Sequence, residues 1–228
     1  MNISLILKNS FDQYKNFYQR LLPWGFFLAV AAAIANSFVL KLANDQVQII
    51  LLSLIIGTLF TSWPQMVLYK LSLQIESKGE ADEDFNNEIA PRWGRYLTVM
   101  YAYQFLILAG LCLFIIPGFL LLTLFWFAPI LLLDLNKDEL IFENFFKQSQ
   151  QLVKGNFWQV FSIMIYTAVF VSAPVLIISW ANIKYAEIIS SVWMALAAPY
   201  VYIAQIQTYV ALKNMKKDEL IKGEDNVG

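Results

Sequence analysis

Long uncharged runs recur along the whole chain and constrain its fold more than any other feature. Residues 118–133 carry no charge and are closed by Asp134, and comparable runs occupy about residues 21–42, 47–73, 96–116, 157–180 and 186–212. A helix that crosses a bilayer needs about 20 apolar residues, with about 17 as the lower end. The chain is therefore predicted to be an all-α, polytopic membrane helix bundle with six transmembrane helices.

The composition agrees with this class of protein. Hydrophobic residues make up 59% of the 228 residues and charged residues 14%, with a mean hydropathy of +0.56, whereas about 25% of a soluble protein is charged. We expect one integral membrane domain over residues 1–212 and a charged cytoplasmic tail over residues 213–228. The main partner is then the lipid bilayer. A net charge of −1 without a basic patch argues against nucleic acid as a partner.

The third and fourth runs are too long together for one crossing. Residues 97–133 would form about 55 Å of helix at 1.5 Å per residue, nearly two bilayer cores. Pro117 and Gly118 lie between them, and this pair is typical of a turn. We therefore predict a tight helical hairpin.

Amphipathic segments precede the odd-numbered runs. Asn136 precedes residues 137–154 and is spaced with Glu139 as a capping box, and Gly155 follows the segment. Within it, apolar side chains fall on one face (Phe142, Phe145, Phe146, Leu152 and Val153). Residues 3–21 form a similar pattern (Ile3, Leu7, Phe11, Tyr14, Tyr18 and Leu21), and a weaker one follows (Phe85, Ile89, Trp93 and Tyr96). We expect these helices to lie in the membrane interface, because a helix with one strongly polar face cannot cross the bilayer.

Prolines recur in phase in the even-numbered runs. Pro64, Pro129 and Pro199 each follow an apolar or aromatic lead, at spacings of 65 and 70 residues. The chain is therefore interpreted as three copies of an amphipathic helix and two spans, over residues 1–75, 76–135 and 136–212. The alternative is a chance alignment, since prolines are common in membrane helices.

The basic residues predict the orientation. Three of the 16 Lys and Arg residues lie in the N-terminal segment, four in residues 70–95, three in residues 137–154 and four in the tail, and only Lys41 and Lys184 lie elsewhere. Cytoplasmic segments carry the excess of basic residues. Both termini are therefore predicted to be cytoplasmic.

Few polar residues interrupt the apolar runs (Asn36, Gln65, Gln104, Asn182 and Gln205). Hydrogen bonds between helices explain such residues most simply. Gln65 and Gln205 each follow a repeat proline, where freed carbonyl groups would help to line a polar path. Both hypotheses are kept for these two residues.

Lys70 and Asp134 follow their prolines by six and five residues, so we expect both near the cytoplasmic rim. One hypothesis is an ion pair between repeats, and the alternative is two separate groups that extend to water. The acidic residues between 76 and 88 lack the spacing of a calcium loop and are interpreted as an exposed, mobile link.

Residues suited to catalysis are scarce. The chain has no histidine, and its one cysteine, Cys112, lies inside an apolar run. No glycine-rich phosphate loop, nucleophile beside a base or metal-ligand cluster is present. We therefore expect no enzymatic activity, no cofactor and no metal site.

Residues 116–161 are similar to a known group of bacterial membrane proteins. The segment combines Pro117–Gly118, Trp126, Pro129, a terminal Asp134 and the run KGNFW at 154–158. It resembles the YciC-type inner-membrane family and the related membrane domain beside glycerophosphoryl diester phosphodiesterases. The resemblance implies a helical bacterial inner-membrane protein without an assigned activity. The phosphodiesterase chemistry belongs to a histidine-containing soluble barrel, which has no counterpart in this sequence.

Two functions remain open on these grounds. The first is a non-enzymatic multi-pass inner-membrane protein of the cell envelope that handles lipids, with phospholipid as a partner, or that assists another membrane protein. The second is a small-molecule transporter or channel, because prolines interrupt spans at repeated positions. A water-accessible path along residues 65–70 and 205–209 would distinguish them.

Overall fold

The computed structural model describes residues 1–42, 45–79, 86–113, 115–134, 142–181 and 185–225. Within these ranges every regular element is helical. Five helical stretches are long and apolar enough to cross a membrane, by length and composition: Ile3–Leu42, Gln48–Lys78, Ile116–Asp134, Phe157–Trp180 and Ala186–Lys217. The prediction of an all-α architecture with several helices able to cross a membrane is therefore confirmed, whereas five candidate spans are found among the described residues instead of the six predicted.

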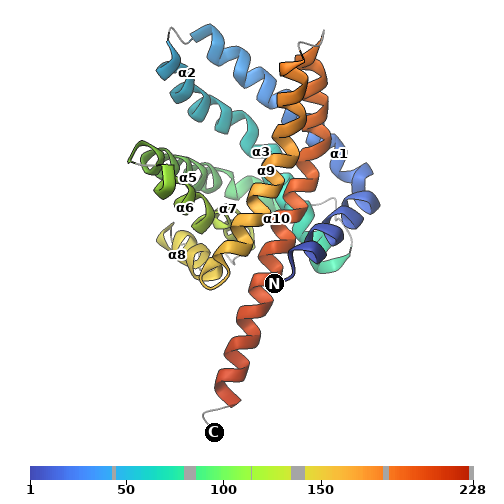
Figure 1. Cartoon of the computed structure of the whole chain (residues 1–228), viewed down its shortest axis with the longest axis vertical. Helices are drawn as coiled ribbons and strands as arrows, with labels where there is room; N and C mark the ends of the chain where they lie inside the picture. Colours follow the sequence, from blue (N-terminus) through green and yellow to red (C-terminus); the bar gives the residue numbers. More distant parts are fainter. Residues whose placement is uncertain (43–44, 80–85, 114, 135–141, 182–184, 226–228) are drawn as a thin grey trace.

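The first amphipathic segment and the first span are one helix. α1 runs over Ile3–Leu42 with Pro23 inside it, and its ribbon bends between the N-terminal part and the rest (Figure 1). Proline permits such a bend because it lacks an N–H and crowds the preceding turn. The apolar face predicted for residues 3–21 is only partly buried in the protein, since Leu21 is fully buried and Phe11 is 58% exposed. Ile6 and Ser10 are buried.

The second span is continuous over Gln48–Lys78, and its one irregular turn lies at a different place from the predicted interruption at Pro64. α2 (Gln46–Leu52) starts at Asp45, whose carboxylate accepts a hydrogen bond from the Gln48 amide, and a π-helix (Ser53–Gly57) follows. α3 then runs without interruption over Thr58–Lys78, with Pro64 inside it. Proline crowds a helix but does not end it where packing holds both sides, and Pro64 is buried.

A short helical segment leads into the predicted hairpin. α4 (Asn86–Ile89) and a 3₁₀-helix (Ala90–Arg92) precede α5 (Trp93–Leu113), which packs against α6 (Ile115–Leu124). The hairpin is confirmed, but Pro117 and Gly118 lie in the first turn of α6 rather than between the helices. A Cβ at Gly110 would lie 3.0 Å from the Cα of Gly118, so the helices touch at two glycines.

The fourth span is broken. Residues Phe125–Phe127 leave helical geometry, and α7 (Ala128–Asp134) continues after them with Pro129 in its first turn. We refer to these three residues as the α6–α7 break. The amphipathic helix α8 (Phe142–Val153) follows, and two residues of its predicted apolar face, Phe145 and Val153, are buried against the rest of the protein. Gly155 has φ +90°, which suits its predicted capping role. The predicted capping box at 136–139 lies outside the described residues.

The last two helices form the third hairpin. α9 covers Phe157–Trp180, as predicted, and α10 covers Ala186–Asp225, so the helix continues into the segment predicted as a charged tail. Trp158 is 71% exposed and Trp180 is 91% exposed. They are separated by about 33 Å of helix, close to the roughly 30 Å of a bilayer core, and exposed tryptophans favour the two membrane interfaces.

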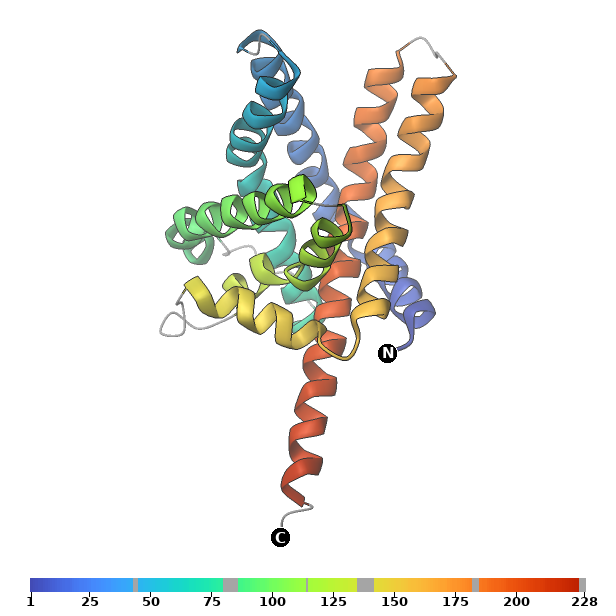
Figure 2. The same ribbon diagram turned by 60° about the vertical axis from the view of Figure 1, so that its left-hand side comes forward.

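The hairpins are arranged around α10, which packs against α1, α3 and α9. The first hairpin (α1 with α2 and α3) and the third (α9 with α10) extend toward the same end of the molecule, and the α5–α6 hairpin lies across them (Figures 1 and 2). The N-terminus of α1 and the C-terminal end of α10 lie toward the opposite end (Figure 2). The core forms where α3, α7 and α10 meet.

Candidate functional site

Pro64, Pro129 and Pro199, which the sequence aligned as a possible repeat, occupy different settings. Pro64 and Pro199 are buried inside the continuous helices α3 and α10, while Pro129 begins α7 after a true break. A Cβ at Gly25 would lie 2.2 Å from the Ala195 carbonyl oxygen and 2.9 Å from Pro199 Cγ. Ala195 is four residues before Pro199, so this carbonyl lacks the helical N–H donor, and α1 approaches α10 there.

Gln205 forms a hydrogen bond with the backbone of the α6–α7 break. Pro129 has no N–H, and the Ile130 amide bonds the Phe127 carbonyl at 3.0 Å, so helical geometry supplies no amide to the Trp126 carbonyl. The Gln205 Nε2 donates to that carbonyl at 2.7 Å, and its Oε1 accepts from the Tyr69 hydroxyl at 2.7 Å. Gln205 is 4% exposed. Its side chain therefore joins α3, α10 and the break, as expected for a hydrogen bond between helices.

Ser149 of α8 supports the same break from another direction. Its hydroxyl donates to the Leu124 carbonyl at 2.7 Å and accepts from the Phe127 amide at 3.2 Å. Ser149 is fully buried. Sequence reasoning missed this residue. It is flanked by glutamines in the sequence, and the polar side of this helix was expected to face water.

Gln65 makes weaker contacts than Gln205. Its Nε2 donates to the Thr61 hydroxyl at 3.3 Å, and its Oε1 accepts from Tyr96 at 3.5 Å. The side chain is half-buried. The two glutamines therefore lie in separate networks and do not form one polar path.

Lys70 and Asp134 do not pair with each other. Lys70 Nζ lies 2.5 Å from Glu88 Oε2, and Asp134 Oδ2 lies 2.5 Å from Lys213 Nζ and accepts from the Tyr209 hydroxyl at 2.5 Å. The prediction of an ion pair between them is wrong. Each group has a nearer partner, on α4 for Lys70 and on α10 for Asp134.

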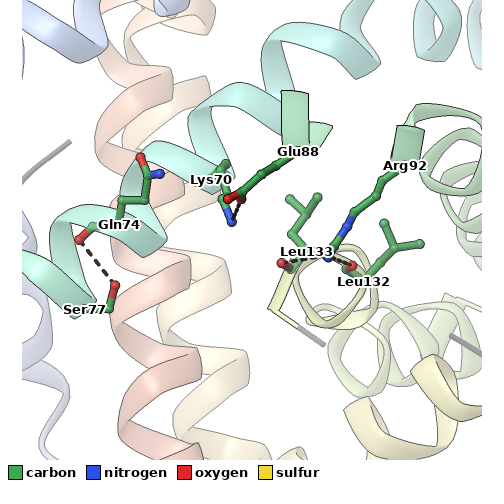
Figure 3. A network of polar contacts seen from close by, with 7 residues as sticks. All are labelled: Lys70, Gln74, Ser77, Glu88, Arg92, Leu132 and Leu133. Atoms are coloured by element: carbon green, nitrogen blue, oxygen red, sulfur yellow. Dashed lines mark hydrogen bonds and ion pairs between the residues drawn. The ribbon is translucent and has the colours of Figure 1, made fainter. Parts of the chain in front are cut away.

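Arg92 contacts the C-terminal end of α7, near the ion pair of Lys70 and Glu88 (Figure 3). Its Nη1 donates to the carbonyls of Leu132 and Leu133 at 3.2 and 3.1 Å. A cation at a helix C-terminus is stabilising because the last carbonyls carry partial negative charge.

The hydrogen bond from the Lys70 ammonium group and its positive charge lower the pKa of Glu88 below its usual value.

The acidic residues at 76–88 are only partly free in water. Glu76 Oε2 accepts from the side-chain amides of Gln13 and Gln207, both at 2.6 Å. This carboxylate joins α1, α3 and α10, so the prediction of an exposed, mobile link is wrong for Glu76. Glu88 is exposed, as predicted, and is paired with Lys70. Residues 80–85 of this stretch lie outside the described residues.

A partly open cavity of 450 Å³ lies between α1, α2, the π-helix, α3 and α5. We call it the lateral cavity. Its walls are aliphatic except for five polar side chains, none of them charged: Asn36, Ser53, Thr58, Thr61 and Gln104. The sequence singled out Asn36 and Gln104 as polar residues in apolar runs but gave no reason to bring them together.

The π-helix shapes one wall of the lateral cavity. Its wider turns release carbonyl groups, and the Ile55 carbonyl accepts from the Tyr101 hydroxyl of α5 at 2.9 Å. Thr58 contacts the Leu54 carbonyl at 2.6 Å and Gln104 Oε1 at 2.7 Å. A Cβ at Gly57 would meet no atom within 4 Å, so the backbone is open to the cavity there. Single π-turns are frequent at functional sites.

The described residues contain no group of three His, Cys, Asp or Glu side chains placed to hold a metal ion. The lateral cavity offers hydroxyl and amide groups, which can bind a ligand through hydrogen bonds. None of its lining residues is ionisable at neutral pH. No family model, curated protein or solved structure matches the chain.

Proposed function

We propose that this chain is a non-enzymatic, multi-pass bacterial inner-membrane protein of the cell envelope that binds lipid. In this proposal six helices enter the membrane as three repeats, and both termini are cytoplasmic. The resemblance to the YciC-type family and the distribution of basic residues support the location and orientation. The three helical hairpins, each with a proline in its second half, support the repeat.

The observation that carries lipid binding is the lateral cavity. Asn36 stands six residues before the end of α1, about 9 Å into the span. Polar groups at that depth are costly when they face hydrocarbon. A cavity that gathers five of them between apolar walls has the chemistry of a site for an amphiphile, and its volume of 450 Å³ is in the usual range of about 300–1,000 Å³ for ligand sites.

Packing favours lipid binding over transport. Met66, Val67 and Leu68 are fully buried, and Gln205 and Thr208 are no more than 4% exposed. The two segments expected to line a water path are therefore packed against other helices. Lipid that enters sideways between α1 and α3 does not need such a path.

Native mass spectrometry on protein extracted gently from its own membrane tests the proposal. We expect a retained lipid of one class that survives exchange into a second mild detergent. A protein without bound lipid under every extraction condition would contradict lipid binding. Fluorescence of a green fluorescent protein fused to the C-terminus tests the orientation, since that fusion folds only in the cytoplasm, and a dark fusion would reverse it.

A further inference from the structure

We infer that the lateral cavity binds the head of an amphiphile that is uncharged and forms hydrogen bonds, such as the hydroxyl and ester groups of a diacylglycerol. The inference rests on the proposed lipid binding and specifies which lipid chemistry the site takes. It excludes the phosphate of a phospholipid as the group held in the cavity.

Two amides in the cavity supply hydrogen-bonding groups without partners of their own. Asn36 is exposed, and its side chain makes no hydrogen bond within the part of the chain that the structure describes. Gln104 uses its Oε1 for Thr58, and its Nε2 has no hydrogen-bond partner among the described residues. In hydrocarbon, unsatisfied donors and acceptors cost free energy, so a ligand that satisfies both amides is stabilised.

The lining chemistry decides against a charged head. A phosphate held away from water needs a cation or several strong donors. No Lys or Arg lines the lateral cavity, and the remaining polar groups there are the hydroxyls of Ser53, Thr58 and Thr61. Hydroxyls and amides suit an ester carbonyl or an alcohol, because these groups form hydrogen bonds without the cost of burying a charge.

Gly57 allows the cavity to be filled without disturbing a neighbour. A Cβ there would meet no atom within 4 Å, and the same is true of Gly94, which is exposed in the first turn of α5 and does not line the cavity. Gly57→Phe therefore blocks the site, and Gly94→Phe is the matched control. Asn36→Leu is a second variant, since it removes an amide that has no hydrogen-bond partner among the described residues.

The experiment compares dioleoylglycerol with dioleoyl phosphatidylglycerol, which share acyl chains and differ in the head. Each lipid is added to the delipidated full chain in mild detergent, and binding is measured by native mass spectrometry. We expect preferential binding of dioleoylglycerol. Gly57→Phe and Asn36→Leu should each weaken it at least about tenfold, equivalent to about 1.4 kcal/mol, and Gly94→Phe should leave it unchanged.

Each other result has a defined meaning. Preference for phosphatidylglycerol would overturn the inference about the head and leave lipid binding in place. Dioleoylglycerol binding that survives both Gly57→Phe and Asn36→Leu would overturn the assignment to the lateral cavity. Absence of binding by either lipid, together with no co-purified lipid, would overturn the proposed function itself.

Discussion

Gln205 Nε2 donates a hydrogen bond to the Trp126 carbonyl at 2.7 Å, and this contact joins α10 to the chain at the point where the fourth span stops being helical. The break exposes backbone groups in an apolar interior, where each unsatisfied group is costly. Gln205 and Ser149 satisfy two of the freed carbonyls from different helices. The broken span therefore depends on α8 and α10 for these two hydrogen bonds.

Gln205→Leu should destabilise the protein strongly. The change leaves the buried Tyr69 hydroxyl and the partly buried Trp126 carbonyl without their partner, and a buried unsatisfied group costs about 1–3 kcal/mol. The melting temperature of the detergent-solubilised protein measures the effect. Gln65→Leu is the control and should cost less, because its hydrogen bonds are 3.3 and 3.5 Å long. Equal losses for the two variants would contradict the central role of Gln205.

Gly25→Ala should destabilise the contact between α1 and α10. The added Cβ would lie 2.2 Å from the Ala195 carbonyl oxygen, so one helix must move. Overpacking of this kind costs about 1–3 kcal/mol. Gly57→Ala is the control, since its Cβ enters open space and alanine favours a helix by about 1 kcal/mol over glycine. A lower melting temperature for Gly57→Ala than for Gly25→Ala would contradict this account.

Asp134 and Lys213 should be coupled, and Asp134 and Lys70 should not. A double-mutant cycle with Asp134→Asn and Lys213→Met should give a coupling of about 0.2–1 kcal/mol, small because the Lys213 side chain is 56% exposed. Asp134→Asn and Lys70→Met should be additive within about 0.5 kcal/mol. Denaturant unfolding in detergent provides both values. Coupling in the second cycle alone would restore the predicted ion pair between Lys70 and Asp134.

Glu88 should make stability depend on pH in the acidic range. Lys70 lowers the pKa of this carboxyl in the folded protein below its ordinary value of 4.5. The stabilisation is therefore complete above pH 4.5 and is lost as pH falls through the lowered pKa. Glu88→Gln should reduce the melting temperature at neutral pH and should match the unaltered protein at low pH.

Lys70→Met is the matched change for this measurement. It removes the cation that lowers the pKa, so its difference from the unaltered protein should also disappear at low pH. The effect will be modest, because Glu88 is 60% exposed and solvent screens the pair. A constant difference across the whole pH range would show that packing, and not the charge pair, accounts for the loss.

Features that depend on local composition were predicted well. The bounds of α9 follow from a run without charges, and the residues that share the apolar face of α8 follow from helical spacing. The break in the second span was placed at Pro64, but the helix continues there and the π-helix lies earlier. Proline marks where a helix is weakened, and the packing around it decides whether the helix bends, breaks or stays regular.

The candidate site was predicted only in part. Gln205 was identified because it is polar in an apolar run, but its partners Tyr69 and Trp126 lie 136 and 79 residues away. Counting from the prolines placed Lys70 and Asp134 near the same rim of the membrane, but in the structure each forms an ion pair with a different residue. Counting along a chain gives the depth of a residue and not its direction around the bundle.

The sequence by itself determined that this chain is helical and apolar enough to enter a membrane, because run length and the cost of burying charge act locally. Only the tertiary structure decided which polar groups meet. Asn36, Thr58 and Gln104 gather at one cavity because the α5–α6 hairpin lies across α3 and the π-helix shifts the register of the wall beside it. Those relationships arise from packing between distant segments, which spacing along the chain does not encode.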